Sequence, residues 1–374
     1  MVEWKKIGEI CTIIRGNRVT KSDLIENGLY PVISGGVSPL GYIDKYNREP
    51  NTITIAQYGS AGYVDIQKEK FWANDVCYSV YPDDEILNKF LFYSLKKEQA
   101  YIYSLRTNAV PAHLPQKDLA GIQIPIPSLD EQNRIVGILD TFTASIDNLK
   151  EQIAQRRKQY EYYRDQLYYA NKADLLEASK RGDTIVKSLE ELGTFTRGRR
   201  FVRTDIVPEG VPCIHYGDMY TYYGVSAEET PTHLTKELSS KLRFAKYGDV
   251  VIVAAGENDL DIGVGVAWLG NEPVVVHDAC FIFEHKMNPK YLSHFMRSRN
   301  YHQQIRMGVV DGKICSISAK ELGRALIAVP SLQEQQRIVS ILDTFEASIQ
   351  NLEAQLSQRE KQYEYYRNKL LTFE

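Results

Sequence analysis

Basic side chains cluster beside a glycine at two places in the sequence, and arginine is the side chain best suited to contact guanine edges and phosphate groups. The earlier cluster flanks Gly16 and Asn17, and the later one flanks Gly198 and Phe201. Because the two placements match, we predict that at least one basic side chain of each cluster contacts nucleic acid, and a solvated surface turn is the alternative. The two clusters comprise Arg15, Arg18, Lys21, Arg197, Arg199, Arg200 and Arg203.

A second set of polar residues lies in loops that follow expected core strands or precede long helical stretches. Such loops can enter a groove of DNA, where side chains meet base edges and phosphates. We treat these residues as contact candidates, with an ordinary surface position as the alternative: Gln57, Tyr58, Arg106, Asn108, Asn258, Arg306 and Lys313. A third basic group is interpreted as surface charge: Lys241, Arg243 and Lys246.

The sequence contains no recognisable catalytic constellation. A methyltransferase needs a glycine-rich cofactor loop, but residues 263–268 offer only G-x-G, and the chain has no Pro-Pro dipeptide and no Walker A loop. Acidic groups for a nuclease would have to come from residues 82–83 and 284–286, far apart in the chain. The seven histidines include no pair at metal-ligand spacing. We therefore predict a chain that is not an enzyme and binds no metal or cofactor itself.

Composition sets the broad class of the protein. A chain of 374 residues with 43% hydrophobic residues can form two or more packed domains. The net charge of −3 supplies no global basic field, which counts against DNA binding by this chain alone and leaves local basic patches open. Five cysteines without a C-x-x-C pair are typical of free thiols in a reducing compartment. With a polar N-terminus and no long apolar run, the chain is expected to be cytoplasmic, with no membrane contact.

The candidate loops stand in front of a stretch that the chain contains twice. Residues 124–167 and 327–370 are identical at 30 of 44 positions without a gap. Ser128 followed by Glu131 forms a predicted helix capping box, and Ser331 with Glu334 repeats it. Each copy should therefore begin a long helix just after its Pro-Ser dipeptide.

Apolar residues in both copies alternate at spacings of three and four, which is the heptad pattern of a coiled coil. A helix of about 40 residues would reach about 60 Å. Repeated tyrosines near the end of each copy favour helix packing or docking of a partner protein over base stacking. The helix-pairing residues are predicted to be Leu139, Phe142, Ile146 and Leu149 with Leu342, Phe345, Ile349 and Leu352.

The segments before the helices are mixed α/β in pattern and echo one another only in short motifs. The Asn-Asp-Val-Cys of residues 74–77 corresponds to the His-Asp-Ala-Cys of residues 277–280. The predicted fold class is α+β: two mixed α/β domains in tandem, each followed by a long helix, with the helices paired as an antiparallel coiled coil of pseudo-two-fold symmetry. The expected domains are residues 1–126, helix 127–169, linker 170–187, domain 188–329 and helix 330–374.

This organisation resembles the specificity subunit of type I restriction–modification systems. The resemblance covers essentially the whole chain and rests on the twice-repeated P-S-L-x-E-Q-x-R-I-V followed by a heptad helix, at residues 127–136 and 330–339. Residues 248–257 also look like part of that family's target-recognition domains. The match at both junctions is far more specific than a single short motif.

The resemblance implies a division of labour among subunits. Each variable domain would read one half of a split double-stranded DNA target, and the paired helices would set the unread gap. This chain would dock two methyltransferase subunits that use S-adenosylmethionine, together with two restriction subunits that use ATP and Mg²⁺. Two rival hypotheses remain: a bivalent protein-binding adaptor with no role in DNA binding, and an enzyme fragment of a fused restriction–methylation polypeptide.

Overall fold

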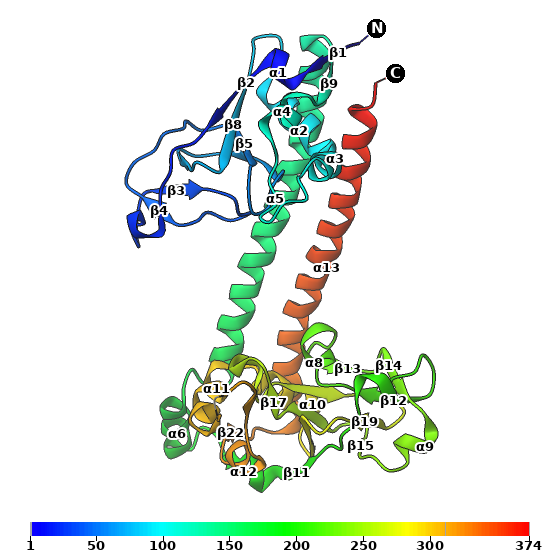
Figure 1. Ribbon diagram of the computed structural model, residues 1–374. Coiled ribbons are helices and arrows are strands. Elements are labelled where there is room, and N and C mark those ends of the chain that lie inside the picture. Colours follow the sequence, from blue (N-terminus) through cyan, green and yellow to red (C-terminus); the bar gives the residue numbers. More distant parts are fainter. Residues whose placement is uncertain (1, 311, 374) are drawn as a thin grey trace. The chain divides into compact units, whose positions relative to one another are not determined.

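A computed structural model describes residues 2–310 and 312–373 and divides the chain into two compact units (Figure 1). The first unit combines Met1–Lys150 with Ala354–Glu374, and the second comprises Glu151–Glu353. Each unit thus contains one globular part and segments of both long helices. Within the described part of the chain, no helix is both long and apolar enough to cross a membrane.

The globular part of the first unit mixes short strands and short helices. Its strands are β1 (Glu3–Lys6), β2 (Cys11–Arg15), β3 (Tyr30–Ile33), β4 (Tyr42–Ile43), β5 (Thr52–Ala56), β6 (Val64–Gln67), β7 (Trp72–Ala73), β8 (Cys77–Pro82) and β9 (Gln123–Ile126). Its helices are α1 (Ile7–Ile10), η1 (Lys21–Asp23), α2 (Asn88–Lys97), α3 (Gln99–Ser104) and α4 (Gln116–Ala120).

An antiparallel sheet in the order β2-β8-β5-β6 forms the centre of the first unit. Strand β5 is buried along its whole length, and its alternating Thr and Ile residues are β-branched, which favours the extended backbone. Helix α2 contributes Phe90 and Leu91 to the hydrophobic core that contains Ile53 and Val80 of the sheet. The sheet is therefore fixed on one face by a packed helix.

The second unit has a richer set of elements. Its strands are β10 (Val186–Ser188), β11 (Gly193–Arg197), β12 (Val211–Ile214), β13 (Ser226–Ala227), β14 (Thr232–Leu234), β15 (Phe244–Ala245), β16 (Val250–Val253), β17 (Ala255–Gly256), β18 (Gly265–Trp268), β19 (Val274–Val276), β20 (Cys280–His285), β21 (Cys315–Ser316) and β22 (Leu326–Ala328). Its helices are α6 (Lys172–Arg181), α7 (Leu189–Leu192), η2 (Arg203–Asp205), α8 (Asp218–Thr221), α9 (Lys236–Ser239), η3 (Asp259–Asp261), α10 (Pro289–Phe295), α11 (Arg299–Ile305), η4 (Arg306–Gly308) and α12 (Ala319–Gly323).

The second unit repeats the sheet of the first unit. Its sheet order is β11-β20-β16-β18-β13, so β11, β20, β16 and β18 take the places of β2, β8, β5 and β6. Strand β16 is buried at every residue, and α10 contributes Leu292 and Phe295 to the same core. A separate four-stranded sheet, β14-β12-β19-β15, is larger than its three-stranded counterpart β4-β3-β7. The two globular parts therefore share a framework and differ in what is added to it.

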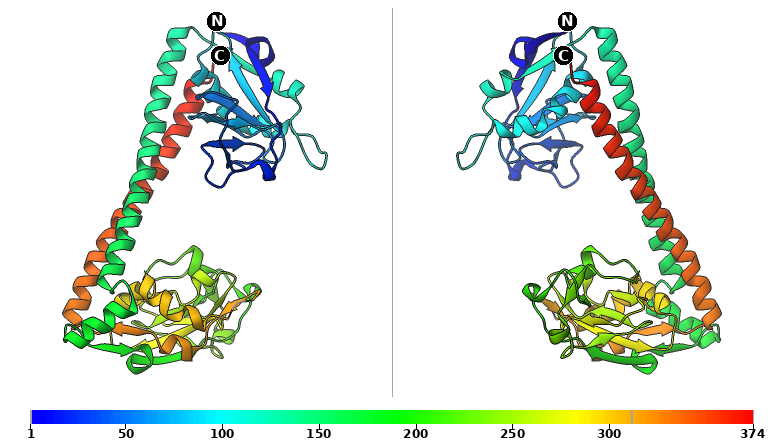
Figure 2. Two further views of the ribbon diagram at one scale, coloured as in Figure 1. Left: turned by 90° about the vertical axis from the view of Figure 1, so that its left-hand side faces the viewer. Right: turned by 90° about the vertical axis from the view of Figure 1, so that its right-hand side faces the viewer.

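Two 39-residue helices, α5 (Leu129–Leu167) and α13 (Leu332–Leu370), follow the two globular parts in the chain. In the first unit, the Phe142 ring stacks on Tyr366 with centroids 5.2 Å apart, and Lys150 pairs with Glu360 at 3.4 Å. Residue numbers rise along one helix and fall along the other, so these segments are antiparallel (Figure 2).

The second unit repeats these contacts with the two helices exchanged. Phe345 stacks on Tyr163 with centroids 5.4 Å apart. The guanidinium of Arg156 lies over the ring of Phe345, and Arg359 lies over Phe142 in the first unit. Arg156 and Arg359 follow Ile153 and Leu356 by three residues and so continue the heptad pattern, and each is accommodated by a cation–π contact.

The residues predicted to pair the helices occupy two environments. Leu139 and Leu342, near the start of each helix, are fully buried and belong to the cores of the domains that precede them. Phe142 and Phe345 lie in the aromatic contacts between helices. The others are buried or half-buried along the two helices: Ile146, Leu149, Ile349 and Leu352.

The predicted fold class is confirmed, because mixed α/β domains and long helices alternate along the chain. The segment expected to be a linker, residues 170–187, contains helix α6. The side chain of Asn171 caps this helix by accepting the N–H of Asp174, and Gly182 ends it with φ of 81°. The sequence does carry this signal, since an Asn cap and a Gly stop bracket residues 172–181.

A buried glutamine joins the start of each long helix to its domain. In the first unit, the side-chain oxygen of Gln132 accepts the N–H of Leu87 at 2.8 Å, and its amide donates to the carbonyl of Pro127 at 3.0 Å. Gln335 makes the corresponding bond to the N–H of Asn288 at 2.9 Å. Both bonds satisfy an N–H at the N-terminus of a domain helix, α2 or α10, which has no partner within that helix.

Replacing Gln335 by Ala is therefore expected to lower the free energy of unfolding by about 2 to 3 kcal/mol, because it leaves a buried N–H and a buried carbonyl without partners. Urea denaturation of the Gln335→Ala chain measures this loss. The matched control is Gln333→Ala, which removes an exposed side chain two residues away and should leave the midpoint unchanged. Equal midpoints for both variants would show that the buried amide does not anchor the helix.

Candidate nucleic-acid interface

The basic residues of the first unit leave the central sheet at one of its ends. Strand β2 ends at Arg15, opposite Tyr78, and β5 ends at Ala56, opposite Cys77. The residues that follow both strands therefore emerge side by side, beside the turn at residues 74–76. We call residues 16–21 the first basic loop.

A second loop of this unit is bound to the same sheet end. The N–H of Leu114 donates to the carbonyl of Gln57 at 2.9 Å, and Tyr58 stacks on His113 with centroids 5.2 Å apart. The contact candidates Arg106 and Asn108 lie in the chain just before these contacts, and both are exposed. The structure thus gathers Arg15, Arg18, Lys21, Gln57, Tyr58, Arg106 and Asn108 around one edge.

Gln57 itself is buried, and its side-chain oxygen has no hydrogen-bond partner among the described residues. Most buried polar atoms in proteins are satisfied, so this unpaired oxygen is unusual, and its burial leaves it out of direct contact with solvent. Arg106 is partly committed, since its Nε donates to the carbonyl of Tyr103 at 2.8 Å.

The second unit repeats the convergence. Strand β11 ends at Arg197, opposite Phe281, and β16 ends at Val253, opposite Cys280. The short strand β17 then pairs with β21, which places the loop after β17 near the loop before β21. We call residues 198–203 the second basic loop. The candidates brought to this edge are Arg197, Arg199, Arg200, Arg203, Asn258, Arg306 and Lys313.

The basic residues in and directly before the two loops differ in what their side chains contact. Arg15 donates through Nε and Nη2 to the carbonyl of Asp75, at 3.2 and 2.9 Å, and Arg197 donates to the carbonyl of Asp278 at 2.7 Å. Arg199 donates to the carbonyl of Lys241 at 2.6 Å. These three arginines brace the turns, whereas the side chains left exposed without such a contact are Arg18, Lys21, Arg200 and Arg203.

A close backbone approach explains the glycine in each basic loop. A Cβ on Gly16 would lie 2.1 Å from the carbonyl oxygen of Ala73, and one on Gly198 would lie 2.2 Å from that of His277. No other residue fits without moving the backbone of residues 73–74 or 276–277. The matched glycines therefore mark the point where each loop is pressed against the neighbouring turn.

Sequence reasoning missed two braces of the same turns. Arg48 donates to the carbonyl of Arg15 at 2.9 Å, and Arg243 donates to the carbonyl of Arg197. Arg243 is exposed, as expected of a surface charge, and its guanidinium also has a backbone partner. Both arginines lie in the segment that precedes the buried central strand, β5 or β16, but no shared local motif marks them.

The cysteines beside the basic loops are core residues. Burial raises the pKa of the thiols of Cys77 and Cys280 to about 12, and both side chains are inaccessible. A thiol with so high a pKa is neither a good nucleophile nor a ready metal ligand.

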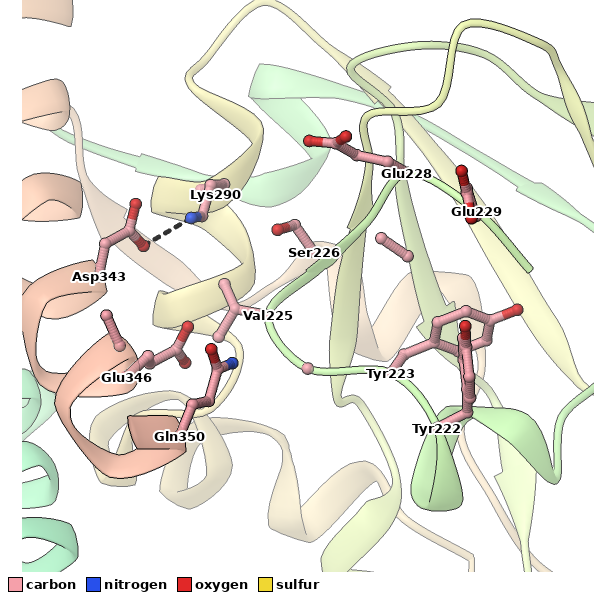
Figure 3. Close-up of a pocket in the computed structure, with 13 residues that line it drawn as sticks. Tyr222, Tyr223, Val225, Ser226, Glu228, Glu229, Lys290, Asp343, Glu346 and Gln350 are labelled. Atoms are coloured by element: carbon pink, nitrogen blue, oxygen red, sulfur yellow. Dashed lines mark ion pairs between the residues drawn. The ribbon is translucent and has the colours of Figure 1, made fainter. Parts of the chain in front are cut away.

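A cavity of about 540 Å³ in the second unit lies beside α10 and α13 (Figure 3). Its wall includes residues 222–229 and the ion pair between Lys290 and Asp343, with 2.6 Å between Nζ and Oδ1. Gln350 and the acidic Glu346 project from the same helix. The cavity is largely polar. It lies beside β13, at the opposite side of the sheet from β11, which leads into the second basic loop.

Three side chains beside this cavity could in principle hold a metal ion: His294, Asp343 and Glu346. Their ligand atoms already have partners, since Tyr160 Oη lies 3.1 Å from both His294 Nδ1 and Glu346 Oε1, and Lys290 neutralises Asp343. Burial lowers the pKa of His294. The group is best described as a hydrogen-bond network that fastens α10 to the helices.

Comparison with known proteins matches the whole chain to one family. The sequence model of the type I restriction modification DNA specificity domain matches residues 1–156 and again residues 182–360. A putative type I restriction enzyme specificity subunit of Haemophilus influenzae is 29% identical over 100% of this chain and 96% of its own length. The specificity subunit of a type I restriction enzyme of Escherichia coli is 28% identical over 100% of this chain and 94% of its own.

Among solved structures, the S subunit of a type I restriction–modification system from Mycoplasma genitalium has the same fold, with a TM-score of 0.64 at 21% identity over 100% of this chain and 97% of that one. Each family match covers one sheet-bearing globular part and much of the long helix that follows it in the chain. The chain belongs to the family of type I restriction modification DNA specificity subunits.

Proposed function

We propose that the loops at the end of each central sheet described above contact one half of a bipartite double-stranded DNA target. The observation that carries this proposal is the repeated convergence of exposed basic and polar side chains at the same end of both sheets. Side chains such as Arg18 and Arg200 are free to contact phosphate or guanine, whereas the bracing arginines hold the loops in place. Residues from distant parts of the chain meet at each edge, as a reading surface requires.

The long helices set the unread gap between the two half-sites in this proposal. Both are continuous over 39 residues, and each unit pairs a segment of one with a segment of the other. Aromatic and cation–π contacts recur in both units, which favours a rigid spacer. The gap then depends on helix length alone.

We further propose that this subunit catalyses nothing and works with partners. Two methyltransferase subunits would bind S-adenosylmethionine, and two restriction subunits would use ATP and Mg²⁺. Exposed tyrosines on the helices, Tyr162 and Tyr365 at 61% and 59%, offer matched docking points for the two methyltransferases. Positively charged surfaces of the methyltransferase subunits would supply the attraction for DNA that a chain of net charge −3 lacks.

Exchanging residues 188–325 for the same segment of another family member is expected to change one half of the recognised sequence and keep the other. Each unit holds its own core and its own basic loop, so the readers should act separately. Mapping methylated sites in cells carrying the hybrid with its partner subunits measures this. A change in both halves would rule out two independent readers.

Inserting one heptad into each long helix, after Lys150 and after Glu353, is expected to lengthen the gap. Seven residues add about 10 Å, which is about three base pairs, and both half-sites should stay the same. Inserting the same seven residues after Gly182, outside the long helices, is the control and should leave the gap unchanged. An unaltered gap in the helix variant would refute the spacer.

Removing an exposed basic side chain should weaken DNA binding without unfolding the domain. For Arg200→Ala in the assembled complex, we expect about a threefold to tenfold weaker affinity and a salt slope shallower by about one. Lys320→Ala removes an exposed charge on α12, which packs against α7 at the opposite end of β11, and serves as the control. An identical salt slope for Arg200→Ala and the unaltered complex would place Arg200 outside the interface.

A further inference from the structure

A second loop of the first unit is tied to the central sheet and closed by hydrogen bonds at its base. The N–H of Leu114 donates to the carbonyl of Gln57, the residue that follows β5. One residue earlier, the carbonyl of His113 accepts the N–H of Thr107 at 2.9 Å, and the N–H of His113 donates to Thr107 Oγ1 at 3.2 Å. We call residues 108–112, which lie between this pair, the first tip loop.

The second unit builds the same support from different residues. The N–H of Ile317 donates at 2.9 Å to the carbonyl of Ala254, the residue that follows β16. One residue earlier, Ser316 exchanges two backbone hydrogen bonds with Val310, at 2.8 and 3.1 Å. We call residues 312–315 the second tip loop. Both tip loops therefore stand at the sheet end from which the basic loops also emerge.

Each tip loop presents an exposed aliphatic side chain. Val110 is 100% exposed and Ile314 is 62% exposed. An exposed aliphatic side chain is ordinary when it stands alone on a protein surface. Here it recurs in both units, on a loop whose base is closed by hydrogen bonds and tied to a buried strand. Both side chains are thus held at a defined place, where a surface from outside the chain can cover them.

Exposed hydrogen-bond donors accompany these aliphatic side chains. Asn108 lies in the first tip loop and Lys313 in the second, and both are exposed. Arg106 and Arg306 are exposed shortly before each loop. Donors next to an aliphatic group match the major groove of DNA, where acceptors on the bases lie beside the C5-methyl group of thymine. The basic loops at the same sheet end favour DNA over a protein as the covering surface.

We propose that Val110 and Ile314 are specificity-determining residues, each of which contacts the C5-methyl group of a thymine in the half-site of its own unit. This proposal rests on the proposed function and deepens it, because it names a base group that each unit recognises. Thymine alone among the four unmodified bases carries a methyl group in the major groove. The basic loop then contacts phosphate and guanine, and the tip loop distinguishes thymine.

Deoxyuridine tests the proposal, because it lacks the methyl group of thymine and keeps its hydrogen-bonding groups. Affinity of the chain assembled with its methyltransferase subunits is measured on duplexes with deoxyuridine in place of every thymine of one half-site, of the other, or of the gap. The domain exchange described above assigns each half-site to its unit. Deoxyuridine in either half-site should weaken binding about fourfold for each contacted methyl group, as expected when one methyl group is no longer buried. Deoxyuridine in the gap should have no effect.

The Ile314→Ala complex should bind the unmodified duplex about fourfold or more weakly, and should no longer respond to deoxyuridine in the second unit's half-site. Its response to deoxyuridine in the first unit's half-site should persist, and Val110→Ala should show the reverse pattern. Ile185→Ala is the matched control, because Ile185 is 65% exposed and precedes β10, at the opposite end of β11 from the second basic loop. This variant should behave as the unaltered complex does.

The possible outcomes separate the inference from the proposed function. Sequence-specific binding that is indifferent to deoxyuridine would overturn the inference alone, and so would half-sites without thymine. An undiminished response to deoxyuridine in the Ile314→Ala complex would also overturn it. Weaker assembly of Ile314→Ala with the methyltransferase subunits, measured by size-exclusion chromatography, would assign the tip loop to a protein contact instead. Binding without any sequence preference would remove the proposed function, and the inference with it.

Discussion

Each long helix is fixed to the domain that precedes it by a buried glutamine amide, and the rest of the arrangement depends on this junction. Gln132 and Gln335 satisfy backbone groups at the start of α2 and α10, the helices that cover the central sheets. Each globular domain and the long helix that follows it therefore meet at a fixed angle within their unit. The residues around the two glutamines are nearly identical in the two copies. The same junction therefore attaches each long helix to a domain that differs from the other domain elsewhere.

The central sheet carries this fixed geometry to its opposite end. Strands β2 and β5, like β11 and β16, stop in register, so the loops behind them emerge together. Backbone carbonyls at this end are braced by arginines, and a glycine permits the close approach of the loop. Arginines bonded to backbone carbonyls and exposed basic side chains thus lie at the same end of each sheet. Exposed loop residues could therefore differ while the bonded arginines keep the loop in place.

Much of the fold could be predicted from sequence because it is repeated. Sequence identity and heptad spacing predict the duplicated helix. As expected for a helix cap, Ser128 and Ser331 each accept the N–H of the residue three positions later. The carboxylates of Glu131 and Glu334 instead accept from Arg134 and Arg337, an exposed pairing that spacing does not distinguish from a capping box. The expected linker, residues 170–187, carries a helix signal, because Asn171 and Gly182 bracket α6.

The candidate site was located but not resolved by sequence. Residue type pointed to Arg15 and Arg197 as readily as to Arg18 and Arg200, yet the first two contact backbone carbonyls of a distant turn. The braces Arg48 and Arg243 each precede a buried central strand without sharing a motif, so only the folded chain shows that they reach matched carbonyls. The echo between residues 74–77 and 277–280 was visible, whereas the hydrogen bonds from these turns to the basic loops follow only from the folded chain.

Selection of random-sequence DNA by the chain assembled with its methyltransferase subunits tests the central claim most directly. Sequencing of the retained DNA should give two short specified blocks separated by a gap of constant length and unspecified sequence. Retention of DNA without any sequence preference, or of a single uninterrupted block, would contradict two readers held by a helical spacer.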